Sequence, residues 1–538
     1  MIVNKNFISN IQKKDRYEMH KYWGKKPSNN LNLLIEEYSN IGDILLDPFC
    51  GYGVFCSEAY ILQRNVILND LNPIATFIEE QLLEKDINLT KLEKEFYIIK
   101  NEMESFSSSW YTLNINNSKC TIVSTLRDEK DKIIKCKYKN SSSRKFIEYT
   151  FSDKEIENFE TLENEAIIND WYPMDKLIEN SRISAKKDML VSDLFTKRAL
   201  INHSKLLSII SSISSGNELK LLLIAFTSNL ANCSKLVPPT PSRGEMAQGA
   251  WMTGFYIAKK YIENNVLHYF ENRVKKVIKG KKDYLSSFNN LFLKNIDLKQ
   301  VNNIEKFNKK TYGYNILNED TKKLSLKDNS IDYIFTDPPY GDTVPYFEQS
   351  IIWNSWLKKV PNYKNEIVIS NSKKRAKKIN EYSKDIGSAI FEIFRVLKYN
   401  KFFSITFHSL SGLEWRAISN ACLEVGFELH NFEWLVQKTF TPRQLNRSKT
   451  VKGDVLITFK KPLIIVKAKK ISGEEFSKIM IDKINQLIQE KKNTTNLIFI
   501  ELIKLIFNKK ILIPKIDIFK ILNQNFTFEN EQWKYNDK

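Results

Sequence analysis

The chain has 538 residues, enough for about two to four domains, and its 82 Lys and Arg against 63 Asp and Glu give a net charge of +19. So basic a composition is typical of proteins that bind a polyanion such as nucleic acid. The sequence shows no long uncharged span, no signal peptide in its first twenty residues and no paired spacing among its six cysteines. We therefore expect neither a membrane protein nor a disulfide-rich secreted one, but a cytoplasmic protein with reduced thiols.

Residues 41 to 70 are predicted to form a strand, a turn, a helix and a second strand. Residues 44 to 46 and 66 to 68 are short apolar strands, and residues 54 to 63 suit a helix. Short apolar strands that alternate with helices are typical of a parallel sheet covered on both faces.

The turn after the first strand reads Asp-Pro-Phe-Cys-Gly-Tyr-Gly, residues 47 to 53. Its glycines permit a tight turn and the close approach of a ligand to the backbone, and the helix start behind it offers free N–H groups to an anion. Asp70 ends the next strand, where an acidic residue is well placed for ribose hydroxyls. Because the turn is not Gly-x-Gly-x-x-Gly, we favour a nucleoside ligand over a pyrophosphate cofactor, with a purely structural turn as the alternative.

The pattern changes between about residues 85 and 300, which are polar and mixed, with small antiparallel strands expected in 112 to 152 and helices in 185 to 235. Strands and helices alternate again after residue 310, and a capping box at Ser472 opens a helix in the tail. This organisation predicts an N-terminal arm and first half-domain over 1–84, an insertion over 85–305, a second half-domain over 306–462 and a helical C-terminal tail over 463–538. The insertion is the candidate target-recognition region.

A second loop with chemical potential follows the predicted strand at residues 331 to 335 and reads Thr-Asp-Pro-Pro-Tyr, residues 336 to 340. Two consecutive prolines fix their φ angles and push the preceding residues toward extended geometry, which makes the loop stiff. It carries a carboxylate, bare carbonyls and an aromatic ring, which suit a flat ring that bears an exocyclic amino group. A rigid turn after a core strand is the plainer interpretation.

Together, the Asp-Pro-Phe-x-Gly-x-Gly turn and the later Asp-Pro-Pro-Tyr loop resemble the DNA amino-methyltransferases that use S-adenosylmethionine. The stretch His-Lys-Tyr-Trp-Gly-Lys-Lys-Pro at residues 20 to 27 is similar to the Lys-Tyr-Trp-Ala-Arg-Lys-Pro segment of one bacterial branch of that family. The resemblance spans about residues 15 to 462, with patchy matches in the insertion. It implies an α/β, Rossmann-like methyltransferase fold with a mostly parallel seven-stranded sheet, interrupted by a mixed α+β insertion.

The resemblance also implies roles for individual residues. Asp70 would hold the ribose, and Asp320 would lie near the adenine amino group of S-adenosylmethionine. The loop around the cofactor would comprise Asp47, Pro48, Phe49, Gly51 and Gly53, and the methionine end would be closed over by Tyr22, Lys25 and Pro27.

The implied reaction is methyl transfer to the exocyclic amine of a base flipped out of double-stranded DNA. Asp337 and the carbonyl of Pro338 would accept the two N–H bonds of the amine, beside Pro339, and Tyr340 would stack on the base. Negative charge at Asp337 would also support the positive charge that develops on the nitrogen.

Two basic clusters are candidate contacts to DNA phosphates, although a solvated face is an equally good explanation of each. They are Arg273, Lys275 and Lys276 near the end of the insertion, and Lys373, Lys374, Arg375 and Lys377 after the second loop. Relatives of this branch often carry a zinc ribbon, but Cys120 and Cys136 stand alone here, so we expect no metal.

The sequence therefore predicts a site-specific DNA methyltransferase that acts on adenine N6, in a restriction–modification system whose endonuclease is a separate protein. Cytosine N4 is the runner-up target, since both amines fit the same loop. Two further hypotheses are an RNA or glutamine methyltransferase and a basic nucleic-acid-binding protein without catalysis.

Overall fold

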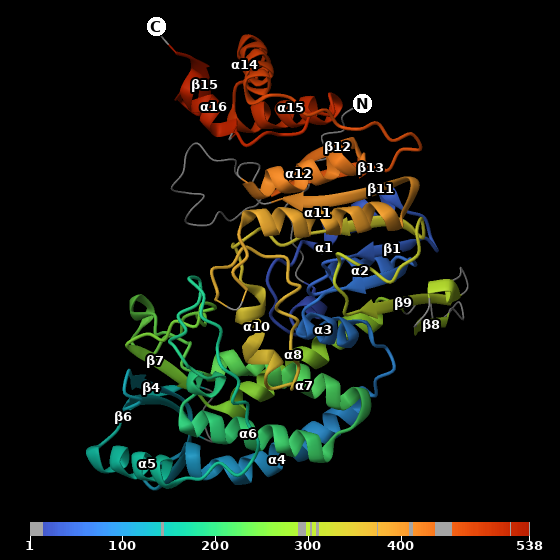
Figure 1. Ribbon diagram of the computed structural model, residues 1–538. Coiled ribbons are helices and arrows are strands. Elements are labelled where there is room, and N and C mark those ends of the chain that lie inside the picture. The colour runs from blue at the N-terminus through green and yellow to red at the C-terminus, as the bar shows by residue number, and fades with distance from the viewer. Residues whose placement is uncertain are drawn as a thin grey trace.

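The computed structural model describes residues 14–140, 145–288, 297–301, 304–307, 311–373, 375–407, 413–435, 454–516 and 518–536. It has three tiers, with the main sheet and its helices in the middle, the insertion at one end and the C-terminal tail at the other (Figure 1). The chain runs from the arm into the middle tier, through the insertion, back into the middle tier and then into the tail.

The main sheet has eight strands in the order β12-β13-β11-β10-β1-β2-β9-β8. All neighbouring strands from β8 through β9, β2, β1 and β10 to β11 pair in parallel. Strand β13 runs antiparallel to both of its neighbours, β11 and β12. The strands are β1 (Ile44–Asp47), β2 (Asn65–Asn69), β8 (Asp297–Gln300), β9 (Thr311–Leu317), β10 (Ile331–Thr336), β11 (Leu397–Phe407), β12 (Glu428–Leu435) and β13 (Asp454–Lys460).

The sheet is thus mostly parallel, as expected, but it has eight strands rather than seven. The additional strand is β8, which lies within the range assigned to the insertion and pairs in parallel with β9 at the edge of the sheet. The number seven came from the family resemblance. The four residues of β8, Asp-Leu-Lys-Gln, carry only one apolar side chain, so the sequence pattern does not indicate a strand there.

Alternate residues of the central strands face two different apolar cores. Leu45 and Val66 belong to the core that includes α1 (Ser28–Tyr38), α2 (Val54–Ile61) and α3 (Pro73–Leu83). Leu46 and Ile67 belong to the core under α11 (Ile379–Val396) and α12 (Leu413–Val425). Because consecutive side chains of a strand point to opposite faces, these continuous apolar runs are explained by helices on both sides.

Strand β2 is the neighbour of β1 toward one edge of the sheet, and β10 is its neighbour toward the other edge. The strand order therefore reverses between β1 and β10. In open α/β sheets, ligands bind outside the carboxyl ends of the strands at such a switch point. The two loops singled out in the sequence follow β1 and β10, and Asp70 follows β2.

The insertion combines long helices with a five-stranded antiparallel sheet, and residues 112 to 150 supply four of its strands, as predicted. A buried ion cluster ties this sheet to α6, since Glu263 pairs with both Arg127 and Arg198. The elements are α4 (Leu89–Tyr111), β3 (Thr112–Ile115), β4 (Ser118–Asp128), β5 (Ile133–Asn140), β6 (Ile147–Thr150), α5 (Asp153–Glu165), α6 (Lys197–Ile213), α7 (Gly216–Leu230), β7 (Lys260–Asn264) and α8 (Val266–Ser286).

The tail consists of α14 (Gly473–Gln489), α15 (Thr495–Asn508), α16 (Ile518–Asn525) and a hairpin of β14 (Phe526–Glu529) and β15 (Gln532–Tyr535). Ser472 caps α14 by accepting a hydrogen bond from the Glu475 N–H, as its position suggested. The tail packs on the main sheet through α15, which contacts β12. In the described residues, we find no helix with the length and apolar character needed to cross a membrane.

The N-terminal arm, residues 14 to 27, is fixed against the insertion helix α8. Arg16 donates to the Asp283 carboxylate at 3.0 Å. Gly280 of α8 lies so close to the arm that an added Cβ would meet the Met19 side chain and stand 2.9 Å from the Asp15 carbonyl oxygen. The arm therefore packs closely on α8 only because Gly280 has no side chain.

We expect Gly280→Ala to destabilise the protein by about 1 to 3 kcal/mol, because an inserted methyl group forces the backbone of the arm away from α8. Gly387→Ala in α11 is the matched control, since a Cβ there meets no atom within 4 Å. The control should gain about 0.5 to 1 kcal/mol of helix stability. Denaturant unfolding of both variants measures the difference, and equal stabilisation by both would contradict the close packing.

Candidate functional site

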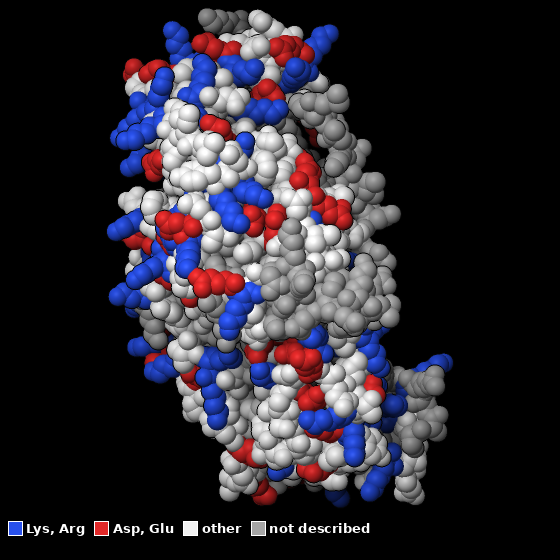
Figure 2. Space-filling view, turned by 90° about the vertical axis from the view of Figure 1, so that its right-hand side faces the viewer, with Lys and Arg blue, Asp and Glu red and all other residues white. Residues whose placement is uncertain are grey.

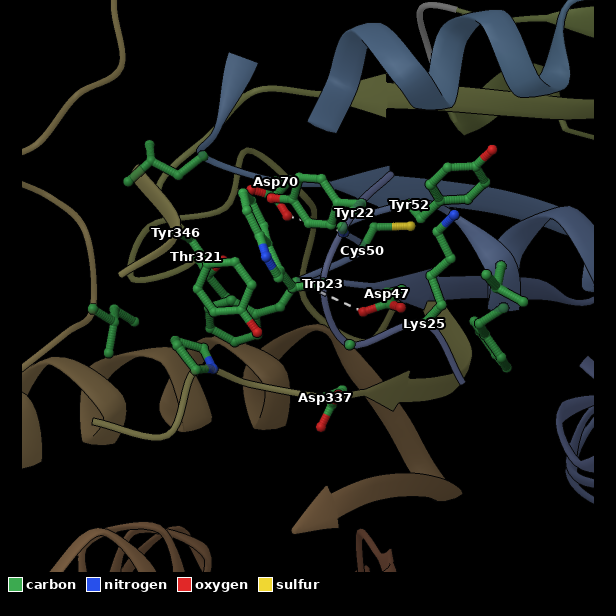
Figure 3. A pocket seen from close by; sticks show the side chains of 18 of the residues that line it. Tyr22, Trp23, Lys25, Asp47, Cys50, Tyr52, Asp70, Thr321, Asp337 and Tyr346 are labelled. Carbon is green, nitrogen blue, oxygen red and sulfur yellow. Dashed lines mark hydrogen bonds between the residues drawn. The ribbon is translucent and has the colours of Figure 1, made fainter. Parts of the chain in front are cut away.

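One pocket, which we call the central pocket, lies at the carboxyl ends of β1, β2 and β10 and is closed on one side by the N-terminal arm. It has a volume of about 950 Å³, including its open mouth. Figure 3 shows Tyr22, Trp23 and Tyr346 gathered beside Asp70, with Asp337 on the opposite side of the view. The residues that line it include Tyr22, Trp23, Lys25, Lys26, Asp47, Phe49, Gly51, Asp70, Asp320, Thr321, Asp337, Pro339, Tyr346 and Glu366.

The pocket brings together most of the residues predicted as a cofactor site. Pro27, Pro48 and Gly53 are not among the lining residues. Pro27 and Gly53 instead precede α1 and α2 as their N-caps, and the Pro48 carbonyl accepts a hydrogen bond from the Thr321 hydroxyl in the loop after β9. These three residues support the loops and helices around the pocket without lining it.

The glycine turn after β1 uses the conformational freedom of both of its glycines. Gly51 and Gly53 both adopt positive φ angles, of 60° and 85°. A Cβ at Gly51 would stand 3.1 Å from the Tyr22 ring, and one at Gly53 would stand 3.3 Å from the Glu79 side chain. Both positions therefore need glycine for conformation and for space.

Asp70 is oriented by two backbone donors. Its carboxylate accepts a hydrogen bond of 2.9 Å from the Gly51 N–H and one of 2.8 Å from the Asn72 N–H. Burial raises the pKa of Asp70 to about 6, against the lowering effect of these two bonds. Because each carboxylate oxygen has a second lone pair, Asp70 keeps acceptor capacity toward the pocket.

Asp47 joins the two loops. Its Oδ1 atom accepts from the Phe49 N–H at 3.1 Å and from the Thr336 hydroxyl at 2.8 Å, and Thr336 immediately precedes Asp337. The Asp47 carboxyl is buried, and this burial raises its pKa to about 8, with further contributions from the Asp337 and Asp70 charges. Sequence reasoning treated Asp47 as a cofactor contact and missed this bond between segments 289 positions apart.

Asn69 was not predicted as a site residue, although it holds the loop after β9 in place. Its side-chain amide donates to the Pro48 and Glu319 carbonyls at 3.2 and 3.1 Å, and its Oδ1 atom accepts from the Glu319 N–H at 3.0 Å. These bonds position Asp320, which lines the pocket and accepts from the Lys322 N–H. The position of this asparagine at the end of a predicted strand was the only feature of the sequence that could have indicated its role.

Asp337 lies in a dense set of donors. Lys26 of the arm forms an ion pair with its Oδ2 atom at 2.9 Å, and the Thr406 hydroxyl donates to its Oδ1 atom at 2.6 Å. The Tyr340 hydroxyl lies within hydrogen-bonding reach of both the Asp337 Oδ1 atom and the Thr406 carbonyl. The structure thus places Asp337 and Pro339 in the pocket lining, but not Pro338 or Tyr340.

Aromatic rings from the arm and from α10 (Tyr346–Asn354) form one wall of the pocket. The Tyr22 and Tyr346 rings stack with centroids 6.2 Å apart, and Trp23 meets Tyr346 edge to face at 6.0 Å. The Trp23 Nε1 atom is buried without a hydrogen-bond partner among the described residues. Sequence reasoning named Tyr22 but neither Trp23 nor Tyr346.

Lys25 stabilises the arm itself. Its ammonium donates to the carbonyls of Tyr17 and His20 at 2.6 and 2.7 Å, and it lies 3.7 Å from the centre of the Tyr52 ring. Burial lowers the pKa of Lys25 to about 7. Its charge is therefore committed to the fold of the arm rather than offered to the pocket.

Of the basic residues predicted to contact DNA, Arg375 has a side chain that is 1% exposed and ion-paired with Glu348 and Glu366, so in this structure it is not available to a phosphate. Lys377 bonds to Asp385, and Lys275 pairs with Glu271. Lys373 is exposed, and Lys374 lies outside the described residues.

Arg273 and Lys276 complete the predicted set, and both line a second pocket. On the face drawn in Figure 2, Lys and Arg are interspersed with Asp and Glu and do not form one basic patch. Among the described residues, no three or more His, Cys, Asp or Glu are arranged to hold a metal ion.

A family model described as DNA methylase matches residues 3–80 of this chain, the span that contains the arm, the glycine turn and Asp70. The type II methyltransferase M.MjaII of Methanocaldococcus jannaschii is 28% identical over 142 residues, which are 26% of this chain and 26% of that protein. The matched part thus spans about a quarter of that curated relative. Both matches are thus to methyltransferases, and each covers about a quarter of this chain or less.

Solved structures of methyltransferases are similar to only part of the chain. A Thermus thermophilus protein described as a candidate DNA modification methylase, complexed with S-adenosyl-L-methionine, is 14% identical and covers 35% of this chain and 63% of its own, with a TM-score of 0.18. A SAM-dependent methyltransferase from Methanosarcina mazei is 14% identical and covers 31% and 82%, with a TM-score of 0.16. At these TM-scores the structural likeness carries no argument.

The raised pKa of Asp47 has a consequence for stability. An aspartate in the unfolded chain titrates near pH 4, whereas Asp47 titrates near 8 in the folded protein. The stability that the protonated carboxyl contributes is therefore complete below about pH 4 and is lost as the pH rises to 8. We expect the melting temperature of Asp47→Asn to rise relative to the wild type between about pH 5 and about pH 8.

Thermal unfolding at the two pH values tests this expectation. Asp342→Asn, in a half-exposed ion pair with Arg182, is the control and should follow the wild type at both. If the melting temperatures of Asp47→Asn and the wild type differ by the same amount at both pH values, Asp47 is not protonated in the folded protein.

Proposed function

We propose that this protein transfers a methyl group from S-adenosylmethionine to the exocyclic amino group of a base in DNA, at N6 of adenine. The observation that carries the proposal is that the glycine turn, Asp70 and Asp337 line one pocket. The loop that we propose for nucleoside binding and the loop that we propose for amine binding therefore border the same pocket. The family match over the first of these loops supports the same reaction class.

The residues present fit S-adenosylmethionine. Asp70 would bind the ribose hydroxyls, and Asp320 and Phe49 would contact the adenine ring. Near the methionine end, Tyr22, Trp23 and Tyr346 offer aromatic faces to a sulfonium, and carboxylates surround the pocket. When bound, the cofactor supplies an activated methyl group, so the protein mainly has to position the two reactants.

Asp337 is the residue that we propose as acceptor of the substrate amine. Its Oδ1 atom already faces the Thr406 and Tyr340 hydroxyls, and its Oδ2 atom faces Lys26. A carboxylate oxygen has two lone pairs, so Oδ2 keeps one for an amino N–H while Lys26 remains in place. The Pro338 carbonyl is the proposed second acceptor.

Duplex DNA hides the amine, and the proposal therefore includes base flipping. Glu366 and Ile367 line the pocket beyond Asp337, and the buried ion pairs of Arg375 hold that segment against Glu348 of α10. We further propose that the insertion contributes to DNA recognition and that the methylation marks host DNA against a separate endonuclease. Asp as the first residue of the Asp-Pro-Pro-Tyr loop favours adenine over cytosine, by the habit of the resembled family.

Incubation with labelled S-adenosylmethionine and unmethylated duplex DNA, followed by digestion to nucleosides, tests the reaction and identifies the base. We expect N6-methyladenine from the wild type, and we expect Asp337→Ala to lower the rate at least about 100-fold while cofactor binding persists. Asp342→Asn in the same loop should retain the wild-type rate. The absence of any methylated nucleoside would refute the proposal, and N4-methylcytosine would correct the base.

The position of Tyr340 generates a separate prediction. If its hydroxyl orients Asp337, Tyr340→Phe should lower the methylation rate nearly as much as Tyr340→Ala, because both lose the bond to the carboxylate. If the ring instead stacks on the base, Tyr340→Phe should be nearly as active as the wild type and only Tyr340→Ala should be impaired. We expect the first result, measured as the rate of a single turnover.

A further inference from the structure

The N-terminal arm separates the central pocket from a second cavity, which we call the arm pocket. This cavity lies between the arm and the insertion and has a volume of about 840 Å³, including its open mouth. Tyr22 and Lys25 line both cavities, so the arm is a wall that they share. Opposite the arm, the lining comes from α8 with Arg273 and Lys276, and from Trp251 and Trp353.

The arm pocket is strongly basic. Its lining includes Lys21, Lys25, Arg273 and Lys276, and Glu18 is the one acid among its described lining residues. The Lys25 ammonium donates hydrogen bonds to two backbone carbonyls. The other three cations are thus left without a carboxylate partner in the part of the chain that the structure describes.

Arg273 is the least compensated of these cations. It forms no hydrogen bond or ion pair with a described residue, and its Nε atom is buried without a partner. Lys21 is an exposed residue, and its ammonium lies 4.2 Å from the centre of the Trp251 ring in the cavity wall. Burial disfavours the charged forms, and it lowers the pKa of both Arg273 and Lys21. A cation that loses water without gaining a counter-ion is costly, and a bound anion would offset the cost.

The shape of the donor set selects the kind of anion. A guanidinium presents a planar fork that matches phosphate oxygens in pairs, and a lysine ammonium adds a point charge. Trp251 and Trp353 are 7% and 1% exposed, and their apolar surfaces exclude water and strengthen charge interactions. Lys275, the neighbour of Lys276, takes no part, because it is paired with Glu271 outside the cavity.

We propose that the arm pocket binds a phosphate group, held by Arg273 and Lys276 of α8 and by Lys21 of the arm. The group belongs either to the backbone of a nucleic acid or to a small phosphate ester. Because the arm also carries Tyr22, and Lys26 with its bond to Asp337, a phosphate bound here would fix the arm in the position that closes the central pocket. This last consequence rests on the proposed function, whereas phosphate binding does not.

Titration of the full-length protein with inorganic phosphate tests the site without any catalytic step. We expect phosphate to raise the melting temperature of the wild type and of Lys275→Gln alike. Arg273→Gln and Lys276→Gln should bind phosphate at least about ten-fold more weakly, as the loss of one charge-assisted hydrogen bond predicts. Without phosphate, Arg273→Gln should be at least as stable as the wild type, because it removes an uncompensated charge. Equal phosphate binding by the wild type and both pocket variants would overturn the proposal.

Binding of duplex DNA at several salt concentrations distinguishes the two sources of phosphate. If a backbone phosphate occupies the pocket, Arg273→Gln should weaken DNA binding. It should also reduce the slope of the logarithm of the binding constant against the logarithm of the salt concentration by about 1, while Lys275→Gln changes neither. If the ligand is a small ester, DNA binding should be unchanged and the loss should be seen with phosphate alone. A failed methylation assay with intact phosphate binding would refute the catalytic function and leave this site standing.

Discussion

The parallel pairing of β1 with β10 is the constraint from which the site follows. Leu45 lies opposite Tyr333 and Leu46 opposite Ile334, so the two strands end at the same edge. Asp47 and Asp337 are therefore brought to the same edge of the sheet, and the bond from Thr336 to Asp47 links the loops that carry them. Any shift in this register would disturb the alignment of the loop after β1 with the loop after β10, because one residue of slippage turns every side chain to the opposite face.

The N-terminal arm is the second element on which the site depends. It packs on α8 through Gly280, contacts Asp337 through Lys26 and presents Tyr22 and Trp23 to the central pocket. Most of these contacts join the arm to residues hundreds of positions away. The arm thus connects the insertion, where we place nucleic-acid contacts, to the loops where we place the chemistry.

The charges of the molecule are distributed in a way that the net charge of +19 conceals. The central pocket is lined by the carboxylates of Asp70, Asp320 and Asp337 beside Lys25 and Lys26, whereas the charged residues that line the arm pocket are four cations and one acid. An acidic pocket suits a cationic cofactor, and a basic one suits phosphate. Several other lysines and arginines, including Arg375 and Lys377, are used in internal ion pairs, which the run of charges in the sequence did not reveal.

The sequence by itself determined the features that depend on neighbouring residues. These include the strand–turn–helix around Asp47, and the strand that precedes the Asp-Pro-Pro-Tyr loop. Such features can be predicted because backbone conformation, apolar periodicity and proline geometry act over a few residues. Asp70 and Asp337 were singled out as candidate site residues from their places after predicted strands, and Asp47 from the family resemblance.

Only the tertiary structure decided which partners those residues meet. It turned the Tyr340 hydroxyl toward Asp337, buried Arg375 between two glutamates and left Arg273 in a cavity without a carboxylate partner among the described residues. It also added β8 to the sheet and Trp23 to the pocket wall. The physical reason is that each of these outcomes depends on contacts between distant segments, and the orientation and burial of a side chain are set by such packing rather than by its neighbours in the chain.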